Sequence, residues 1–266
     1  MIDIKKLIEV YGDQNFDWGE LSEFKGNYIN FGYWKNINFD GDITLEQRIR
    51  SSKELYLYVI DKLGIASNDT VVEIGCGRGV GIVELLLNRQ VKKVIAVDLS
   101  HNQIKIAIDN LKNINDHNQY NIEFIQGSAE NTRLEDESID KVFTVEAAHH
   151  FSSIDAFTFE MKRILKPGGK LCMVTYFPKN KLASEKFKTM LRFINEGLET
   201  AVPVVDVAKS FVGAGFRAVA YKEFGEHVFH GFDKWVSQVN SDNEVSRVHY
   251  SAYCEGLIDY YIFEVC

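Results

Sequence analysis

Long apolar runs are missing from this sequence. No stretch approaches the ~20 consecutive apolar residues that span a bilayer, and the first eighteen residues, MIDIKKLIEVYGDQNFDW, contain no apolar core of a signal peptide. Lysine and arginine form no cluster along the chain, whose formal net charge is −8. These absences disfavour a membrane span, a secreted protein and a nucleic-acid partner. We therefore expect a cytoplasmic protein.

Cysteine is scarce as well. The four cysteines lie far apart, at positions 76, 172, 254 and 266, and no two of them form a CxxC pair. A disulfide framework and a zinc site are therefore not indicated. Oxygen and nitrogen ligands do not cluster in the sequence either, so no metal is expected. Cys76 lies between two glycines, where a small side chain is needed, and we interpret it as space-filling rather than as a nucleophile.

The most informative stretch is VVEIGCGRG, residues 71 to 79. An apolar run that contains Glu73 leads into three glycines at alternate positions, Gly75, Gly77 and Gly79. A second apolar run, VIAV, ends in Asp98. Strand, glycine turn, helix, strand and acid is the order of a nucleoside-binding βαβ unit. Glycines let the backbone turn sharply and approach a ligand closely, and the acid can accept hydrogen bonds from both ribose hydroxyls.

The spacing of the glycines distinguishes two classes of nucleoside ligand. A dinucleotide-binding loop reads G-x-G-x-x-G, with the diphosphate at a helix N-terminus; here its third glycine would fall on Val80. Glu73 precedes the glycines on the side from which a diphosphate would approach, and a carboxylate repels that group. The same carboxylate favours the cationic end of S-adenosylmethionine. We therefore predict that S-adenosylmethionine binds to Glu73, Gly75, Cys76, Gly77 and Asp98.

Together these segments resemble motifs I and II of the class I S-adenosylmethionine-dependent methyltransferases. Three later segments resemble other parts of that family in the right order: the adenine loop QGSAE at 126–130, strand four and the segment after it at 138–151, and RILKPGGKLCMV at 163–174. The resemblance covers residues 55 to 176. It implies S-adenosylmethionine as cofactor and S-adenosylhomocysteine as product.

The resemblance also implies further cofactor contacts. Ser128 stands where many relatives have an aspartate that binds the adenine amino group, so its hydroxyl makes a weaker bond and the backbone of Ala129 compensates. The backbone of Glu146, after strand four, is placed beside the methionine ammonium group. Leu99 and Gln103, which follow the second strand, complete the expected cofactor-binding residues.

A histidine pair, His149-His150, follows the fourth expected strand directly. This places the pair at the carboxyl edge of the sheet, where ligands bind in such folds. The resemblance places the segment beside the transferring methyl group, and natural-product and sugar O-methyltransferases carry a similar pair. One histidine is expected as the general base for a hydroxyl proton; the alternative is a buried histidine that packs beneath a lid. The residues after strand five, Thr175-Tyr176-Phe177, offer no carboxylate for a histidine–acid relay.

The stretch NYINFGYW, residues 27 to 34, resembles a tyrosine- and glycine-rich element of sterol, tocopherol and phosphoethanolamine methyltransferases. In those enzymes the element closes over the cofactor. The resemblance implies that Tyr28, Tyr33 and Trp34 contact the cofactor, with a tyrosine beside the sulfonium. The alternative is an aromatic staple that holds the N-terminal segment to the core. The later histidines His227, His230 and His249 are interpreted as surface residues, with the lining of an acceptor pocket as the alternative.

Expected strands and helices alternate from residue 70 to 176, which favours a parallel sheet. Strand five is expected at 170–176, after a Pro-Gly-Gly turn, and an amphipathic helix within 230–250. The resemblance implies an α/β, Rossmann-like fold with a mostly parallel seven-stranded sheet, helices on both faces and a helical lid. We expect an N-terminal helical and aromatic cap at 1–50, the cofactor-binding core at 51–178, and the rest of the sheet with lid insertions at 179–266.

These expectations combine into a small-molecule methyltransferase. A hydroxyl group is the favoured methyl acceptor. The aromatic lid segments indicate a bulky, partly apolar molecule, such as an aromatic, polyketide or glycosylated metabolite. Methylation of carbon on a sterol-, quinone- or prenyl-like acceptor is the near alternative. A protein that binds the cofactor without turnover and a nicotinamide oxidoreductase are rivals from other classes. The sequence leaves both a monomer and a homodimer open.

Overall fold

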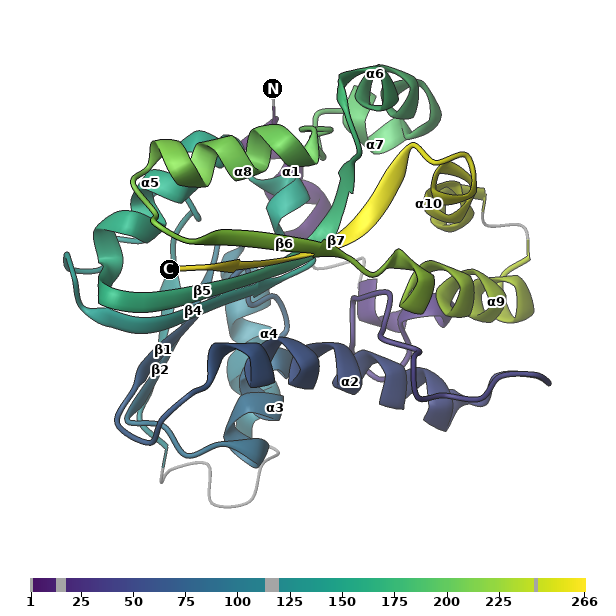
Figure 1. Ribbon diagram of the computed structural model, residues 1–266. Coiled ribbons are helices and arrows are strands. Elements are labelled where there is room, and N and C mark those ends of the chain that lie inside the picture. Colours follow the sequence, from purple (N-terminus) through teal and green to yellow (C-terminus); the bar gives the residue numbers. More distant parts are fainter. Residues whose placement is uncertain (1, 13–17, 113–119, 242–243) are drawn as a thin grey trace.

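The computed structural model describes residues 2–12, 18–112, 120–241 and 244–266. Its centre is a seven-stranded sheet with the order β3-β2-β1-β4-β5-β7-β6 (Figure 1). Strands β1 to β5 are parallel, whereas β7 runs antiparallel to β5 and to β6. The predicted Rossmann-like, mostly parallel seven-stranded sheet is confirmed. The strands are β1 (Thr70–Ile74), β2 (Lys93–Asp98), β3 (Ile122–Gln126), β4 (Ile139–Val145), β5 (Leu165–Pro178), β6 (Val219–Glu223) and β7 (Ile258–Val265).

Strand β5 begins earlier than expected. It starts at Leu165 rather than at residue 170, because Leu165 already pairs with Ile139 of β4. The regular register resumes where Lys141 pairs with Lys170, and the Pro-Gly-Gly segment lies in the irregularity between these pairs. Gly168 has a φ of +80°, which glycine adopts at little cost. The Pro-Gly-Gly segment, which we expected as a turn before the strand, therefore lies inside β5 and shifts its register.

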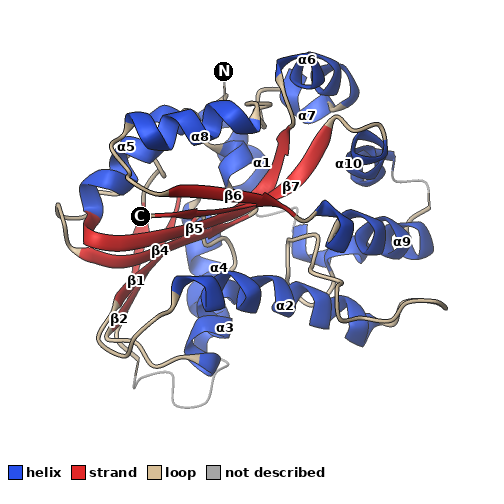
Figure 2. Cartoon of the chain, viewed as in Figure 1, coloured by secondary structure: helices blue, strands red, loops and turns tan. Residues whose placement is uncertain are grey.

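Helices cover both faces of the sheet (Figure 2). Because side chains alternate along a strand, Val71 and Ala96 belong to one buried cluster, and Val72 and Val97 belong to another. The first cluster contains residues of α2 (Leu45–Leu63), α3 (Val80–Asn88) and α4 (His101–Lys112). The second contains residues of α5 (Ile154–Ile164) and α8 (Val204–Gly213). Two apolar layers therefore fix the sheet, and its carboxyl edge is left for the site.

Local capping explains where two of these helices begin. Thr44 and Gln47 form a capping box at the start of α2, in which the Thr44 hydroxyl accepts from the Gln47 backbone. Gly64 ends that helix in the left-handed conformation. Ser100 accepts from the backbone of Gln103 at 3.3 Å, as expected of a cap for α4. These caps fix the first turns of α2 and α4.

The remaining helices gather near the carboxyl ends of β1, β2 and β4. They are α1 (Ile4–Gly12), α6 (Lys181–Met190), α7 (Arg192–Asn195), α9 (Phe229–Val239) and α10 (Glu244–Cys254). The helix expected within 230–250 is α9, and α10 follows it as a separate helix. Helix α9 ends at Val239 with Asn240 as its C-cap, because Asn favours breaks over helix interiors. Within the described ranges, no helix combines the length and the apolar character needed to cross a bilayer.

Candidate active site

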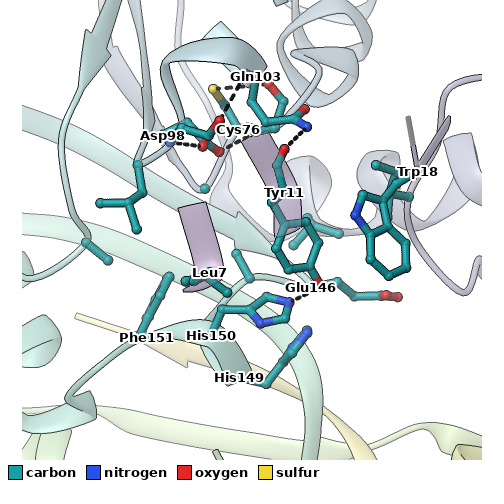
Figure 3. A pocket seen from close by; sticks show the side chains of 18 of the residues that line it. Leu7, Tyr11, Trp18, Cys76, Asp98, Gln103, Glu146, His149, His150 and Phe151 are labelled. Atoms are coloured by element: carbon teal, nitrogen blue, oxygen red, sulfur yellow. Dashed lines mark hydrogen bonds between the residues drawn. The ribbon is translucent and has the colours of Figure 1, made fainter. Parts of the chain in front are cut away.

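A cavity of about 500 Å³ lies at the carboxyl ends of β1, β2 and β4 (Figure 3). Its walls come from the glycine loop, the segments after β2, β3 and β4, and the helices α1 and α10. Residues 192 to 199 supply a further part of the wall. The structure brings to this cavity eleven of the residues that the sequence predicts, which are Gly75, Cys76, Gly77, Asp98, Leu99, Gln103, Ser128, Ala129, Glu146, His149 and His150.

The glycine loop is tied to the end of β2 by its backbone. The amides of Gly75 and Cys76 donate to Val97 O at 2.8 and 3.0 Å, and the amide of Gly77 donates to Asp98 Oδ2 at 2.8 Å. Asp98 Oδ1 accepts from the amide of Ser100 at 2.8 Å. Each carboxylate oxygen keeps a second lone pair. Burial raises the pKa of Asp98, and the backbone donors oppose that shift. Asp98 is therefore a fixed pair of acceptors at the cavity wall.

Gly77 leaves open space at the loop. It has a φ of +49°, and a Cβ built there would meet no atom within 4 Å. Gly75 differs, because a Cβ there would collide with Ala147. Close backbone approach by a ligand is therefore available at Gly77, whereas Gly75 serves the packing of the loop on the segment after β4.

The two histidines lie on a short 3₁₀ turn, η4 (Ala148–His150), and they differ in their bonds. His150 Nδ1 lies 2.7 Å from Leu198 O, so this nitrogen carries the proton, and Nε2 accepts from the Tyr11 hydroxyl at 3.0 Å. Burial lowers the pKa of His150 to about 4. Both nitrogens of His150 are thus engaged, and its ring is held neutral.

His149 presents a different arrangement. Its Nδ1 lies 2.8 Å from Thr175 Oγ1, and its ring stacks on Tyr176 with centroids 4.6 Å apart. Burial lowers the pKa of His149 well below its ordinary value, and His150 and His249 add to this effect. Nε2 makes no hydrogen bond to the described part of the chain. It is therefore the histidine nitrogen of the pair that is available to a ligand.

A carboxyl group that the sequence did not indicate lies beside the histidines. Glu199 is 6% exposed and accepts from the Tyr176 hydroxyl at 2.7 Å. Burial raises its pKa to about 7. One ligand atom from each of His149, His150 and Glu199 lies within 4.8 Å of the others, so the expectation that no such atoms cluster is wrong. A carboxyl group from a distant segment therefore lies near the histidines, whereas Thr175-Tyr176-Phe177 in β5 offers none.

Glu146 accepts two hydrogen bonds in the cavity wall. It has a φ of +50°, and its Oε1 accepts from the backbone amide of Phe31 and from the Tyr260 hydroxyl, both at 2.7 Å. Burial raises its pKa to about 7, while these donors and the charge of Arg48 oppose the shift. Glu146 therefore joins the N-terminal segment to β7 from inside the cavity.

Helix α1 closes one side of the cavity. Its residue Tyr11 bonds His150, and the backbone carbonyl of Tyr11 accepts from Gln103 Nε2 at 2.8 Å (Figure 3). Trp18 stacks on Tyr11 with ring centroids 5.2 Å apart. Gln103, which the sequence assigned to the cofactor, therefore holds α1 in place. Tyr11 was not found from the sequence, because nothing marked the first helix as part of the site.

Comparison with known families agrees with this arrangement. A family model described as a methyltransferase domain matches residues 72–173, which run from β1 into β5. Erythromycin 3''-O-methyltransferase of Saccharopolyspora erythraea is 28% identical over 241 residues, covering 85% of this chain and 75% of that enzyme. Phthiotriol/phenolphthiotriol dimycocerosates methyltransferase of Mycobacterium tuberculosis is 32% identical over 158 residues. That match covers 59% of this chain, and the chain spans only 56% of that relative's length.

Residues 72–173 form a methyltransferase domain, and the homologues indicate an S-adenosylmethionine-dependent enzyme. The fold agrees over nearly its whole length. Geranyl diphosphate C-methyltransferase from Streptomyces coelicolor, solved with Mg²⁺, geranyl diphosphate and S-adenosyl-L-homocysteine, has a TM-score of 0.79 at 12% identity, covering 98% of this chain and 97% of that one. A cyclopropane synthase from Mycobacterium tuberculosis has a TM-score of 0.73 at 18% identity, with 97% of each chain covered. Such low identities show a shared fold and nothing further.

The cofactor of the methyltransferase is S-adenosylmethionine. The chain's own groups fit it, because Asp98 offers spare lone pairs at the cavity wall and Gly77 leaves its backbone uncovered. The two rival classes, a nicotinamide oxidoreductase and a protein that binds the cofactor without turnover, are set aside by the family match.

Glu73 is not brought to the cavity of the methyltransferase. Its carboxyl group lies against the first turn of α3, where it accepts from the backbone of Ile82 and fills the space beside Gly81. Burial raises its pKa well above the ordinary value, and the nearby Asp98 adds to the shift. A carboxyl group that is 1% exposed and lies behind the loop does not face a diphosphate in the cavity. The electrostatic argument from the sequence therefore fails on geometry, although the cofactor that it predicted is confirmed.

Tyr28 and Tyr33 also lie outside the cavity lining. The Tyr28 hydroxyl donates to Glu84 Oε1 at 2.6 Å, and burial raises its pKa. Tyr33 stacks on Tyr58 with ring centroids 4.8 Å apart. Their neighbours Asn27, Ile29 and Phe31 line the cavity instead. The segment 27–34 therefore lies at the cavity, but the residues that line the cavity are not the tyrosines that the sequence assigned to the cofactor.

Trp34 packs away from the cavity. It is 2% exposed, its Nε1 donates to Phe31 O at 2.8 Å, and its indole lies against Gly231 so closely that a Cβ there would collide with the ring. It belongs to a small buried cluster with Ile37, Ile43 and Trp235. This environment matches the staple interpretation, in which the N-terminal segment is held to α9.

We expect Trp34→Ala to lower the free energy of unfolding by about 3–5 kcal/mol, because a large buried side chain leaves a cavity between α9 and the N-terminal segment. S-adenosylhomocysteine affinity, measured at a temperature where the variant is folded, should stay near that of the wild type. Trp34→Phe serves as the control and should lose less stability. Near-normal stability with a large loss of affinity would contradict the staple and favour a cofactor contact.

Proposed function

We propose that this methyltransferase transfers the methyl group of S-adenosylmethionine to a neutral hydroxyl group of a bulky, partly apolar small molecule. The observation that carries the proposal is the continuity of the cavity. Asp98 and the glycine loop line it at one end, and His149 lines it together with aromatic side chains at the other. A donor and an acceptor can therefore lie in the same enclosed space.

The donor end would be bound as follows. Asp98 accepts hydrogen bonds from the ribose hydroxyls, and Ser128 and Ala129 bind the adenine edge. Gly77 allows the backbone to approach the methionine part, and Leu99 packs on the nucleoside. Bound S-adenosylmethionine supplies an electrophilic methyl group on a sulfonium. The protein then contributes position and a dry site for an in-line displacement.

His149 would act as the general base. Its Nε2 takes the proton of the acceptor hydroxyl, while Thr175 fixes the ring through Nδ1 at 2.8 Å. The lowered pKa of His149 keeps the ring unprotonated near neutral pH, so it is ready to accept a proton. Glu199 lies close enough for its carboxylate form to stabilise the resulting imidazolium. His150 is already bonded at both nitrogens and would position Tyr11 and α1 instead.

The cavity lining favours an uncharged acceptor. Apolar and aromatic side chains line much of it, including Leu7, Trp18, Phe24 and Phe31. Arg78 and Arg192 are the only lysine or arginine residues among the described lining, which carries five acids, Glu23, Asp98, Glu130, Glu146 and Glu199. Such a wall offers few cationic partners to a phosphorylated acceptor. The similarity to an enzyme named as an O-methyltransferase supports a hydroxyl as the target.

Methylation of carbon on a neutral acceptor is the second candidate. The carboxyl group of Glu146 favours it, because it lies in the cavity with a pKa near 7 and is able to take a proton from carbon. The fold shared with a geranyl diphosphate C-methyltransferase is compatible with either reaction.

Product analysis separates the two reactions. The protein is incubated with S-adenosylmethionine labelled with ¹³C at the methyl group and with a panel of phenols, glycosides, macrolides and prenylated quinones. We expect the labelled carbon to appear as a methyl ether in the NMR spectrum of the product. A labelled methyl group bonded to carbon would overturn the hydroxyl proposal and establish the second candidate. Heat-denatured protein serves as the control.

A further inference from the structure

His249 has two buried ring nitrogens without a hydrogen-bond partner among the described residues. It lies on α10, is 6% exposed, and lines the cavity. Neither Nδ1 nor Nε2 has a hydrogen-bond partner among the described residues, although both atoms are buried. A neutral imidazole carries one donor and one acceptor, and leaving both unpaired in the interior is costly. Such a group calls for a partner that the described part of the chain does not supply.

Aromatic rings fix the position of His249. Its ring centroid lies 4.6 Å from that of Tyr176, 5.2 Å from that of Phe31 and 6.1 Å from that of Phe187. These contacts hold the ring without satisfying its nitrogens, and burial lowers its pKa to about 3. The imidazole is therefore neutral at ordinary pH. A neutral ring in an apolar wall binds an uncharged oxygen better than an anion.

His249 and the proposed base flank the same ring. His149 and His249 both lie with their ring centroids 4.6 Å from that of Tyr176. The two imidazole centroids are therefore no farther apart than twice that distance. The Tyr176 hydroxyl is already committed to Glu199. A ligand that bonds His149 through one oxygen can therefore reach His249 with a second polar group.

We propose that His249 binds a second, uncharged oxygen of the acceptor, and that it thereby selects hydroxylated or carbonyl-bearing molecules over hydrocarbons of the same shape. This inference rests on the proposed function for the position of the acceptor, and it specifies its chemistry. The acceptor carries at least two oxygens, one at the methylated position near His149 and one within reach of His249. A sugar ring or an oxygenated aromatic ring can carry both.

The first test measures stability. His249→Phe keeps a ring of similar size and removes two unpaired polar atoms, so the melting temperature of the S-adenosylhomocysteine complex should rise. The matched control is His149→Phe, which deprives Thr175 of its partner and should lower the melting temperature. A lower melting temperature for His249→Phe, together with unchanged ligand selectivity, would show a structural role and overturn the proposal.

The second test measures selectivity with a matched probe pair. p-Cresol and toluene differ by one hydroxyl group, and their affinities for the S-adenosylhomocysteine complex are compared after correction for their partition from water. We expect the wild type to prefer p-cresol by about tenfold or more, because the hydroxyl satisfies a buried group. His249→Phe should remove most of the preference, whereas His249→Gln, which keeps a donor and an acceptor, should retain part of it.

The outcomes are distinct from those of the product analysis. The probes bind to the demethylated cofactor complex, so selectivity is measured whether the enzyme methylates oxygen or carbon. A wild type that binds both probes alike, or binds neither, overturns the role of His249. A preference that survives in His249→Phe but disappears in His149→Phe assigns the hydroxyl to His149 alone and also overturns it.

Discussion

Asp98→Ala is expected to weaken S-adenosylhomocysteine binding at least about 100-fold. Two hydrogen bonds from ribose hydroxyls to a carboxylate contribute roughly 1.5–3 kcal/mol each, and about 1.4 kcal/mol corresponds to a tenfold change in affinity. The substitution also deprives the amides of Gly77 and Ser100 of their acceptor, so the loop loses its fixed position. Isothermal titration calorimetry with the purified variant gives the affinity directly.

Asp98→Asn is the matched variant for this prediction. It keeps one acceptor oxygen and the size of the side chain but removes the charge, so its affinity should fall between those of Asp98→Ala and the wild type. The melting temperature of each unliganded variant shows whether weaker binding comes from a lost ribose contact or from unfolding. A value near that of the wild type indicates the lost contact. Wild-type affinity in a folded Asp98→Ala protein would remove the ribose assignment.

His149→Ala is expected to lower kcat by about 10²–10⁴, the usual contribution of a general base. S-adenosylhomocysteine affinity should change by less than about threefold, because the base contacts the acceptor and not the nucleoside. The measurement is the rate of S-adenosylhomocysteine formation with the acceptor identified by product analysis. Thr175→Val, which removes the bond that orients the ring, should give a smaller loss in the same direction.

His150→Ala is expected to behave differently. Its nitrogens bond Leu198 O and the Tyr11 hydroxyl, so its loss should loosen α1 and raise KM more than it lowers kcat. Tyr11→Phe removes the same bond from the other side and should show the same pattern. If kcat falls in His150→Ala and not in His149→Ala, the roles of the two histidines are reversed. If neither variant is slower, the base lies elsewhere.

The part of the structure that the sequence predicts best is the part set by local pattern. The glycine spacing, the acid after β2 and the buried runs determine β1 to β4, because these elements are specified by neighbours close along the chain. The same logic places Asp98 and His149 at one edge, since the carboxyl ends of parallel strands meet there. Eleven of the predicted site residues line the cavity for this reason.

The parts that the sequence does not predict depend on distant contacts. Glu73 was assigned to the ligand because its charge was considered without its burial, whereas the fold directs it against α3. Glu199 and His249 enter the cavity through segments whose positions depend on the packing of α7 and α10, and no periodic pattern marks them. The sequence does not show whether Tyr28 and Trp34 contact a ligand or pack in the core, because aromatic residues suit both environments.

A crystal structure of the S-adenosylhomocysteine complex tests the central claim most directly, namely that donor and acceptor share one cavity between Asp98 and His149. We expect both ribose hydroxyls within hydrogen-bond distance of the Asp98 carboxylate, and the sulfur facing the space bounded by His149 Nε2 and the ring of Phe31. A ribose bound elsewhere, or a sulfur that faces away from His149, would contradict the account.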